Sequence, residues 1–314
     1  MNEFKTVLLA VLPVFGIAVA GIFMRKWNWL TEEADKSLLR LTVNVLAPCL
    51  IFDSILQNQA LKQIGNLTLA PVIGFGTVAL GMGIGFALSK ISGLRERTKI
   101  STFILCIGLY NYGYISVPLG YSLFDRETIG VLFVHNLGVE IALWTLGLMV
   151  LSGSTAGAWR KIFNPPVIAV IITVPLNFLH GDQWIPAFIL TTIGMLAQCA
   201  IPIGIILVGA TMADHLHEFH STSGWRVIFG SCVLRAGLLP FLFLMLAKYL
   251  PCSIELKRVI VLQSAMPTAT FAIILARHYG GDAATAFRAV LATSVVGLIT
   301  IPFWIRFGIK FVGL

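Results

Sequence analysis

The sequence predicts an all-α polytopic membrane protein with ten transmembrane helices in two inverted five-helix repeats, in which broken helices four and nine cross. Three observations lead to this prediction. First, the 314 residues are 57% hydrophobic and only 11% charged, with a mean hydropathy of +0.90, whereas soluble domains carry about 25% charged residues. Second, apolar runs near the ~20 residues that cross a bilayer recur along the chain. Third, two runs contain helix-interrupting residues at corresponding places.

The apolar runs follow one another with short polar connections. The first, Phe4 to Met24, is long for the apolar region of a signal peptide, and we expect a retained span. The next expected spans are 37–57, 67–91, 99–123, 128–151, 165–179, 187–210, 225–247, 257–277 and 284–308. The span at 165–179 is short and begins with Pro165-Pro166, which suits the first turn of a helix.

Basic residues are concentrated on one side of the predicted membrane. They follow odd-numbered spans, as in Arg25-Lys26 and Arg160-Lys161. Because Lys and Arg in short loops stay cytoplasmic, both termini should lie on the outer, periplasmic side of a plasma (inner) membrane. The net charge of +8 then reflects topology and contact with the lipid bilayer, and no nucleic-acid partner is expected.

Weak self-similarity divides the chain into two halves. An amide lies four residues before a proline in both Asn44–Pro48 and Gln198–Pro202, and three further matches keep this offset of about 155 residues. Each half holds an odd number of spans, so the halves must be inverted, as in secondary transporters. We therefore expect a first repeat at 1–151, a cytoplasmic linker at 152–164 and a second repeat at 165–314.

The two interrupted spans predict the position of a site. Ile107 to Leu123 includes Pro118, and Gln263 to Ala269 includes Pro267. Proline removes a backbone donor and clashes with the preceding turn, and freed backbone groups cost several kcal/mol each if they face lipid. Merely kinked helices are the alternative. Corresponding breaks instead favour a midplane site, where half-helix N-termini attract an anion.

Several polar residues are expected at membrane depth, among them Asn44, Asn111 and Gln263. Glu140 and Arg235 are charges that cost about 2.5–3.5 kcal/mol on insertion scales, so each needs a cavity or a partner. Glu140 is therefore a candidate protonatable coupling group. The alternative is an ion pair between Glu140 and Arg235, and Arg235 is also a candidate contact for a substrate carboxylate.

Several motifs together resemble the auxin efflux carrier family, within the bile acid/auxin carrier superfamily. They are Tyr110-Asn111-Tyr112-Gly113 followed by Pro118, Asn164-Pro165-Pro166, Ile201-Pro202 running to Val208-Gly209-Ala210, Ala265-Met266-Pro267, and Leu275-Ala276-Arg277-His278-Tyr279-Gly280. The resemblance covers essentially the whole chain. It implies a scaffold domain of the first, second, sixth and seventh spans, and a transport domain that carries the crossed fourth and ninth helices.

Bacterial members of that family are identified as permeases for malonate, malate or similar carboxylates, and plant members export auxin. The chain resembles the compact bacterial type, because it lacks the long central loop of many plant members. Tyr112 replaces a small residue and Thr268 a second proline, so the substrate does not carry over. The substrate-binding candidates are Asn44, Ile51, Asn111, Tyr112, Gly113, Glu140, Gln263, Pro267 and Thr268.

The expected function is secondary active transport of a small organic anion, a carboxylate, by alternating access. The coupling ion (proton or sodium) and a homodimer are left open. The alternative is a sodium-coupled organic-anion symporter of the bile-acid type. An enzyme would need paired carboxylates or a metal set at depth, and a channel would need pore-lining charge rings; the sequence offers neither. No cofactor or metal is expected: a Walker-type loop is absent, and His215, His217 and His220 fall in a short loop.

Overall fold

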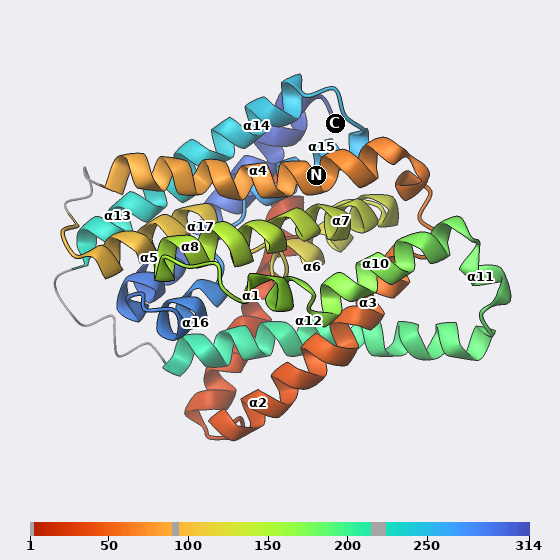
Figure 1. The fold of residues 1–314 in the computed structure, drawn as a ribbon, viewed down its shortest axis with the longest axis horizontal. Coiled ribbons are helices and arrows are strands. Elements are labelled where there is room, and N and C mark those ends of the chain that lie inside the picture. The colour runs from red at the N-terminus through yellow and green to blue at the C-terminus, as the bar shows by residue number, and fades with distance from the viewer. Residues whose placement is uncertain (1–2, 90–93, 215–223) are drawn as a thin grey trace.

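A computed structural model describes residues 3–89, 94–214 and 224–314 of the chain. Seven helical segments among these residues are long and apolar enough to cross a membrane: Lys5–Lys26, Glu32–Ile55, Ile64–Ser89, Arg126–Ser152, Ala187–Asp214, Trp225–Tyr249 and Ala283–Val312. The described chain is otherwise made of shorter helices and their connections (Figure 1). The protein is therefore an all-helical, multi-pass integral membrane protein.

The first half of the chain contains four long helical segments and one interrupted segment. Its elements are α1 (Glu3–Lys26), α2 (Glu32–Leu41), η1 (Thr42–Leu46), α3 (Ala47–Ile55), η2 (Ala60–Lys62), α4 (Ile64–Ser89), α5 (Arg97–Gly108), α6 (Ser116–Leu123), α7 (Arg126–Ala142), η3 (Leu143–Gly147) and α8 (Leu148–Ser152). The π-helical turns η1 and η3 join the helices on either side of them without a break.

The second half begins with two short helices and contains the other interrupted segment. Its elements are α9 (Ala158–Ile162), α10 (Pro165–Phe178), α11 (Gly181–Trp184), α12 (Ala187–Asp214), α13 (Trp225–Val233), η5 (Leu234–Leu238), α14 (Leu239–Tyr249), α15 (Ile254–Ser264), α16 (Phe271–His278) and α17 (Ala283–Val312). The predicted spans at 99–123 and 257–277 are thus each two helices with a non-helical segment between them.

Side-chain caps fix where several helices begin. The side chains of Asp125, Asn164, Ser253 and Asp282 each accept a hydrogen bond from the backbone N–H three residues later. Such a bond satisfies one of the four donors left free at a helix start. The starts of α7, α10, α15 and α17 are therefore encoded locally.

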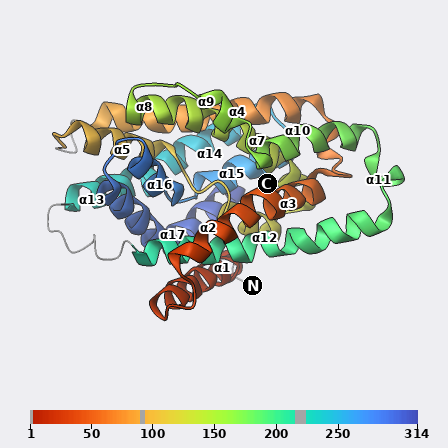
Figure 2. The same ribbon diagram turned by 60° about the horizontal axis from the view of Figure 1, so that its bottom comes forward.

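The helices form a main body and a projecting layer. In the projecting layer α12 packs against α1 and α3, and α10 packs against α3. Figures 1 and 2 show α10, α11 and the end of α12 next to α11 extending from one side of the molecule. In the body α4 packs against α5 and α7, and α17 packs against α13, α14, α15 and α16.

Glycines allow α4 and α7 to touch backbone to backbone. A Cβ atom placed on Gly138 would lie 1.8 Å from the carbonyl oxygen of Pro71, and one on Gly74 would lie 2.1 Å from that of His135. Small residues of this kind permit close helix approach within membranes. The two helices therefore form one tightly joined pair, and α7 carries the polar residues that follow.

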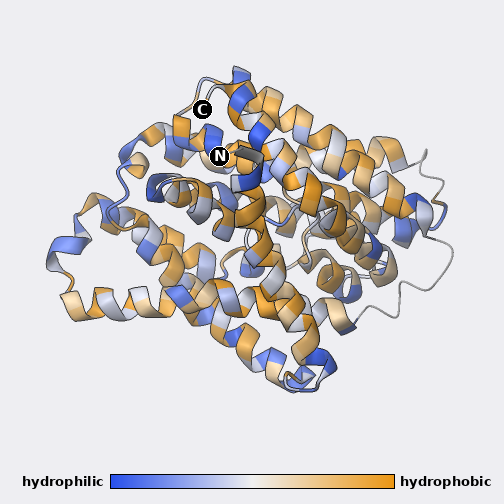
Figure 3. Ribbon diagram, turned by 180° about the vertical axis from the view of Figure 1, so that it is seen from behind, coloured by the Kyte–Doolittle hydropathy of each residue, from blue (hydrophilic) through white to orange (hydrophobic). Residues whose placement is uncertain are grey.

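Hydrophobic residues cover most of the helix surfaces, and hydrophilic ones gather at turns and helix ends (Figure 3). Large apolar side chains such as Val72, Phe188, Met195 and Ile299 are exposed on the outside of the described structure. A bilayer would cover these side chains. The five cysteines are all free.

Candidate functional site

The two non-helical segments, 109–115 and 265–270, pair with each other, and we call this element the crossing. The N–H of Asn111 donates to the carbonyl of Pro267 at 2.8 Å, and the N–H of Ala269 donates to the carbonyl of Leu109 at 3.0 Å. Tyr110 and Thr268 thereby form an antiparallel bridge. Backbone groups freed by one break are satisfied by the other, as burial in a membrane requires.

The predicted break in the first half is present, but Pro118 does not cause it. Helix α5 already ends at Gly108, and Pro118 lies in the first turn of α6, where proline is tolerated. The side chain of Asn111 instead shapes the start of α6, because its Oδ1 accepts the N–H of Ile115 at 3.1 Å. Pro267, in contrast, lies within the second break as predicted.

Thr268 fixes the crossing to two neighbouring helices. Its Oγ1 donates to the carbonyl of Cys106 at 3.0 Å, and its N–H donates to Oγ1 of Thr293 at 3.1 Å. The residue is fully buried. Thr268 therefore belongs to the internal structure of the crossing, although the sequence analysis had placed it among the substrate contacts.

A chain of amides links the two breaks through α7. Gln263 Nε2 donates to Asn136 Oδ1 at 3.2 Å, and Asn136 Nδ2 donates to the carbonyl of Tyr112 at 3.0 Å. Gln263 Oε1 is buried and has no hydrogen-bond partner among the described residues. His135 Nε2 is likewise buried without a hydrogen-bond partner among the described residues, while His135 Nδ1 lies 3.4 Å from Asn136 Oδ1. Near the crossing, Gln263 Oε1 and the buried Arg235 Nη1, which also has no partner among the described residues, are thus left for further partners.

Glu140 receives three hydrogen bonds from uncharged groups. Its carboxylate accepts from the hydroxyl of Tyr112 at 2.7 Å, Nε1 of Trp144 at 2.9 Å and Nδ2 of Asn164 at 3.1 Å. No ion pair joins Glu140 to Arg235 or to any other basic side chain of the described chain. The ion-pair alternative is therefore wrong for this conformation, because Arg235 has other partners.

Arg235 is bound to the carbonyl end of α15. Its Nε donates to the carbonyl of Met266 at 2.9 Å and its Nη2 to that of Gln263 at 3.2 Å. The guanidinium carbon lies 4.9 Å from the ring centroid of Tyr110 and 5.4 Å from that of Phe243. A cation is stabilised both by a helix C-terminus and by aromatic faces. At 1% exposure, Arg235 is a buried counter-charge to the interrupted helix.

The remaining candidates have different surroundings. Asn44 is exposed, and its Nδ2 donates to the carbonyl of Arg40 in its own helix at 2.7 Å. The side chain is thus satisfied locally, and the structure does not join it to the crossing. Ile51 is part of the same buried apolar cluster as Tyr110. Gly113 has open space beside it, because an added Cβ would meet no atom within 4 Å.

Sequence reasoning missed two side chains that hold Glu140. Trp144 lies one helical turn after Glu140, a spacing that places both on one face. Asn164 caps α10, with Oδ1 accepting the N–H of Val167 at 3.0 Å. The signal for Asn164 was present in the sequence, because an asparagine before Pro165-Pro166 is a helix-start pattern.

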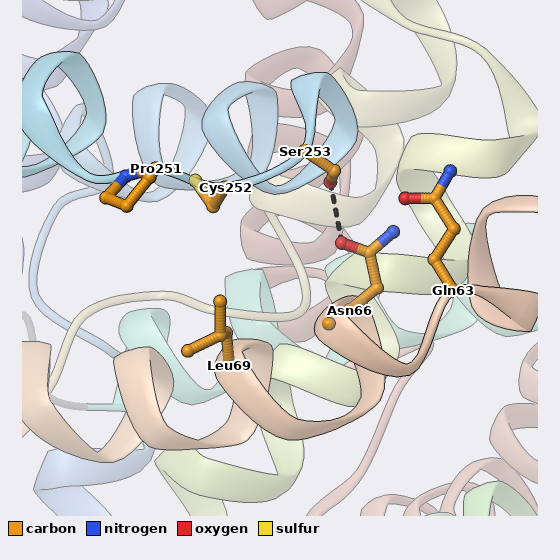
Figure 4. Close-up of a pocket in the computed structure, with 7 residues that line it drawn as sticks. Gln63, Asn66, Leu69, Pro251, Cys252 and Ser253 are labelled. Carbon is orange, nitrogen blue, oxygen red and sulfur yellow. Dashed lines mark hydrogen bonds between the residues drawn. The ribbon is translucent and has the colours of Figure 1, made fainter.

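A cavity of about 440 Å³ lies apart from these residues and is lined by Gln63, Gly65, Asn66, Leu69, Pro251, Cys252 and Ser253. Figure 4 shows the Asn66–Ser253 hydrogen bond of 2.6 Å at its edge. Within the described ranges, no three His, Cys, Asp or Glu side chains are grouped to hold a metal. His215, His217 and His220 lie outside the described residues.

Comparison with known proteins places the chain among transporters. A family profile described as "Membrane transport protein" matches residues 6–158 and 149–305. An uncharacterized transporter of Methanothermobacter thermautotrophicus is 26% identical over 298 residues, covering 94% of this chain and 96% of that protein. A second, from Methanocaldococcus jannaschii, is 25% identical over 301 residues with the same coverage. Protein ECM3 of Saccharomyces cerevisiae is 25% identical over 158 residues, which are 49% of this chain and 25% of that protein.

Proposed function

This chain belongs to the membrane transport protein family, the auxin efflux carriers, and we propose that it is a secondary active carrier of a small organic anion. Membership of the family makes it a transporter and not an enzyme. The proposal adds a substrate class, a carboxylate, and a mechanism, alternating access across the plasma membrane.

The pairing of Asn111 with Pro267 is the observation that carries the proposal. It brings two helix starts, those of α6 and α16, to one place. The positive ends of the two helix dipoles favour an anion there. Discontinuous helices that meet at the repeat interface are the arrangement by which many secondary transporters hold substrate.

The interrupted helices also support two inverted repeats. Ile254 follows Arg97 by 157 residues and Ser264 follows Gly108 by 156; Phe271 follows Ser116 and His278 follows Leu123 by 155 each. These offsets agree with the one predicted from sequence. We accordingly propose repeats at 1–151 and 165–314, joined by the linker 152–164, with ten membrane-crossing segments.

The two layers of the fold support a division of labour. We propose that α1, α2–α3, α10 and α12 form a scaffold, and that the body containing the crossing moves against it. The basic connections after odd-numbered segments support an orientation with both termini outside. The linker 152–164 would then face the cytoplasm.

Glu140 is the proposed coupling group. Its carboxylate binds Tyr112 of the crossing and Asn164 of the linker, so protonation would replace an acceptor by a donor between them. A proton on Glu140 would also remove negative charge near a bound anion, and the two binding events would favour each other by the same factor. Sodium coupling of the bile-acid type is the second candidate, and the unpartnered Gln263 Oε1 favours it as a possible oxygen ligand.

Uptake into proteoliposomes tests the proposal. The purified protein would be supplied with radiolabelled acetate, malonate, malate and benzoate, with and without a proton or a sodium gradient. The expected result is saturable uptake of at least one carboxylate, at a rate above that of vesicles containing the Asn111→Ala variant. Gradient dependence would distinguish the two coupling ions. Uptake equal to that of protein-free vesicles for every carboxylate would refute the substrate class.

A further inference from the structure

Six residues near the crossing, which we call the vestibule, are half-buried: Tyr112, Glu140, Trp144, Lys161, Asn164 and Tyr279. By contrast, Asn111, Gln263, Arg235 and Thr268 are buried. The vestibule lies on the side of the linker, which supplies two of its members.

Lys161 brings an unpaired positive charge into the vestibule. Its Nζ lies 4.3 Å from the ring centroid of Tyr279 and 5.7 Å from that of Trp144. No acidic side chain of the described chain forms an ion pair with it. Glu140 lies close by through Asn164, whose Nδ2 donates both to Glu140 and, at 3.3 Å, to the carbonyl of Lys161. The one nearby carboxylate is thus taken by uncharged donors, and the ammonium is left free.

Arg235, the other cation near the crossing, is not available in the same way. Nε and Nη2 are bound to carbonyls, and Nη1, which has no partner among the described residues, is buried with the rest of the side chain. Aromatic rings, in contrast, hold an ammonium without neutralising its charge, and by about 0.5–2 kcal/mol. A carboxylate forms a stronger charge-assisted hydrogen bond. Lys161 can therefore exchange its aromatic contacts for an anion without breaking a salt bridge.

We propose that Lys161 binds the carboxylate of the transported anion in the vestibule, before it reaches the crossing. The inference rests on the proposed function and adds a substrate contact to it. It also gives Glu140 a role near this contact: an unprotonated Glu140 adds negative charge that opposes an anion at Lys161, and a protonated one does not. Because an ammonium is a point charge on a flexible stem, this contact selects for charge and leaves the shape of the acid to other groups.

The kinetic test compares Lys161→Gln, Lys161→Arg and Arg160→Gln in proteoliposomes, with the panel carboxylate that the wild type takes up fastest. Lys161→Gln should raise KM about tenfold or more with Vmax within about twofold, and Lys161→Arg should recover most of the affinity. Arg160→Gln, which removes an exposed charge of the same helix, should match the wild type. An unchanged KM in Lys161→Gln, or a loss confined to Vmax, overturns the inference.

A second measurement uses the wild type and does not depend on how variants fold. The protein is treated with an amine-reactive ester, and the modification of Lys161 is measured by mass spectrometry with and without the same carboxylate. Protection of Lys161, but not of Lys257, is expected; equal modification of Lys161 overturns the inference. Transport by the wild type with no effect at Lys161 would refute this contact alone, whereas no carboxylate uptake would refute the proposed function.

Discussion

The backbone of Asn111 donates to the carbonyl of Pro267 at 2.8 Å, so that each half of the chain completes the interrupted helix of the other. The side chain of Asn111 has a separate task, since its Oδ1 accepts the N–H of Ile115 where α6 starts. One residue therefore joins the two breaks and also shapes a helix start that faces the proposed site.

Asn111→Ala should reduce carboxylate binding by about 1–3 kcal/mol, the cost of leaving a buried group unsatisfied, and Pro267→Ala should also reduce it strongly. Binding would be measured with purified protein that is monodisperse in detergent. Asn111→Asp keeps an acceptor for Ile115 but adds a negative charge that opposes an anion, so it should keep the start of α6 without restoring carboxylate binding. Asn44→Ala is the matched control, because Asn44 bonds only within its own helix. Wild-type affinity in Asn111→Ala and Pro267→Ala would place the site elsewhere.

Glu140→Gln tests the coupling hypothesis. Substrate affinity of the wild type should rise as the pH falls from about 8 to about 5, because a protonated Glu140 no longer opposes an anion. The glutamine variant should bind at pH 8 as the wild type does at low pH, with a flatter profile. The exposed Asp53→Asn variant should keep the wild-type profile. A well-folded Glu140→Gln protein with the full pH dependence would remove Glu140 from the mechanism.

Arg235→Gln should lower thermal stability in detergent, because it leaves the carbonyls of Gln263 and Met266 without their donors. The expected cost is about 1–3 kcal/mol for each buried group that loses its partner. The double variant Glu140→Gln/Arg235→Gln should be no more stable than Arg235→Gln, since the two residues are not partners. Recovery of the melting temperature in the double variant would instead reveal a direct pair.

The proposed orientation can be tested by chemical labelling. In a protein without its five native cysteines, Ser154→Cys and Gln183→Cys should react with a membrane-impermeant maleimide from opposite sides. The site in 152–164 should be protected in intact cells and react after permeabilisation. Labelling of Ser154→Cys from outside would reverse the orientation. Labelling of both sites from one side would contradict a single crossing by α10.

Asp125 makes stability depend on pH. It accepts from the N–H and Oγ1 of Thr128 at 2.9 and 2.6 Å and from Arg258 at 2.5 Å. Partial burial opposes ionisation, but the Thr128 hydrogen bonds and the Arg258 charge together lower the pKa of Asp125. The charged carboxylate therefore stabilises the fold at pH values above its ordinary pKa near 3.9. This stabilisation is lost as the pH falls below that value towards the lowered pKa of Asp125.

Asp125→Asn keeps the helix cap but not the charge, so its melting temperature should fall less than that of the wild type between pH 6 and pH 3. Asp125→Ala also removes the cap and should cost about 0.5–2 kcal/mol at pH 7. Asp182→Asn, at a surface position bound to Gln57, serves as the comparison. Identical acid transitions in the wild type and Asp125→Asn would contradict the assignment.

Helix breaks were predictable because their cause is local. Proline and glycine oppose a continuous helix, and both predicted breaks occur, although α1, α4, α10, α12 and α17 each continue through a proline. Pro118 was the wrong residue to single out, since a proline marks a helix start as readily as a break. The hydrogen bond from the N–H of Ile115 to Asn111 Oδ1, which shapes the start of α6, depends on a backbone conformation that residue types alone do not specify.

Long-range partners were not predictable. Arg235 donates hydrogen bonds to carbonyls 28 and 31 residues later in the chain. The hydrophobic periodicity of a sequence does not predict which helix end a buried charge will contact. Asn44 was selected because its spacing repeats in the second half, but it bonds to Arg40 one turn earlier, as asparagine often does. Lys161 drew attention only as a topology signal, because the rings that hold its ammonium lie on separate helices, η3 and the end of α16.

Helix α10 has 14 residues, which at 1.5 Å each extend about 21 Å, well short of the ~30 Å hydrocarbon layer. A short span makes the surrounding bilayer thin or draws its flanking residues inward. Here the flanking residue is Asn164, which binds Glu140. If α10 is one of the ten proposed membrane-crossing segments, the acyl-chain length of the lipids would act on this hydrogen bond, and membrane thickness would become a mechanical input to the site.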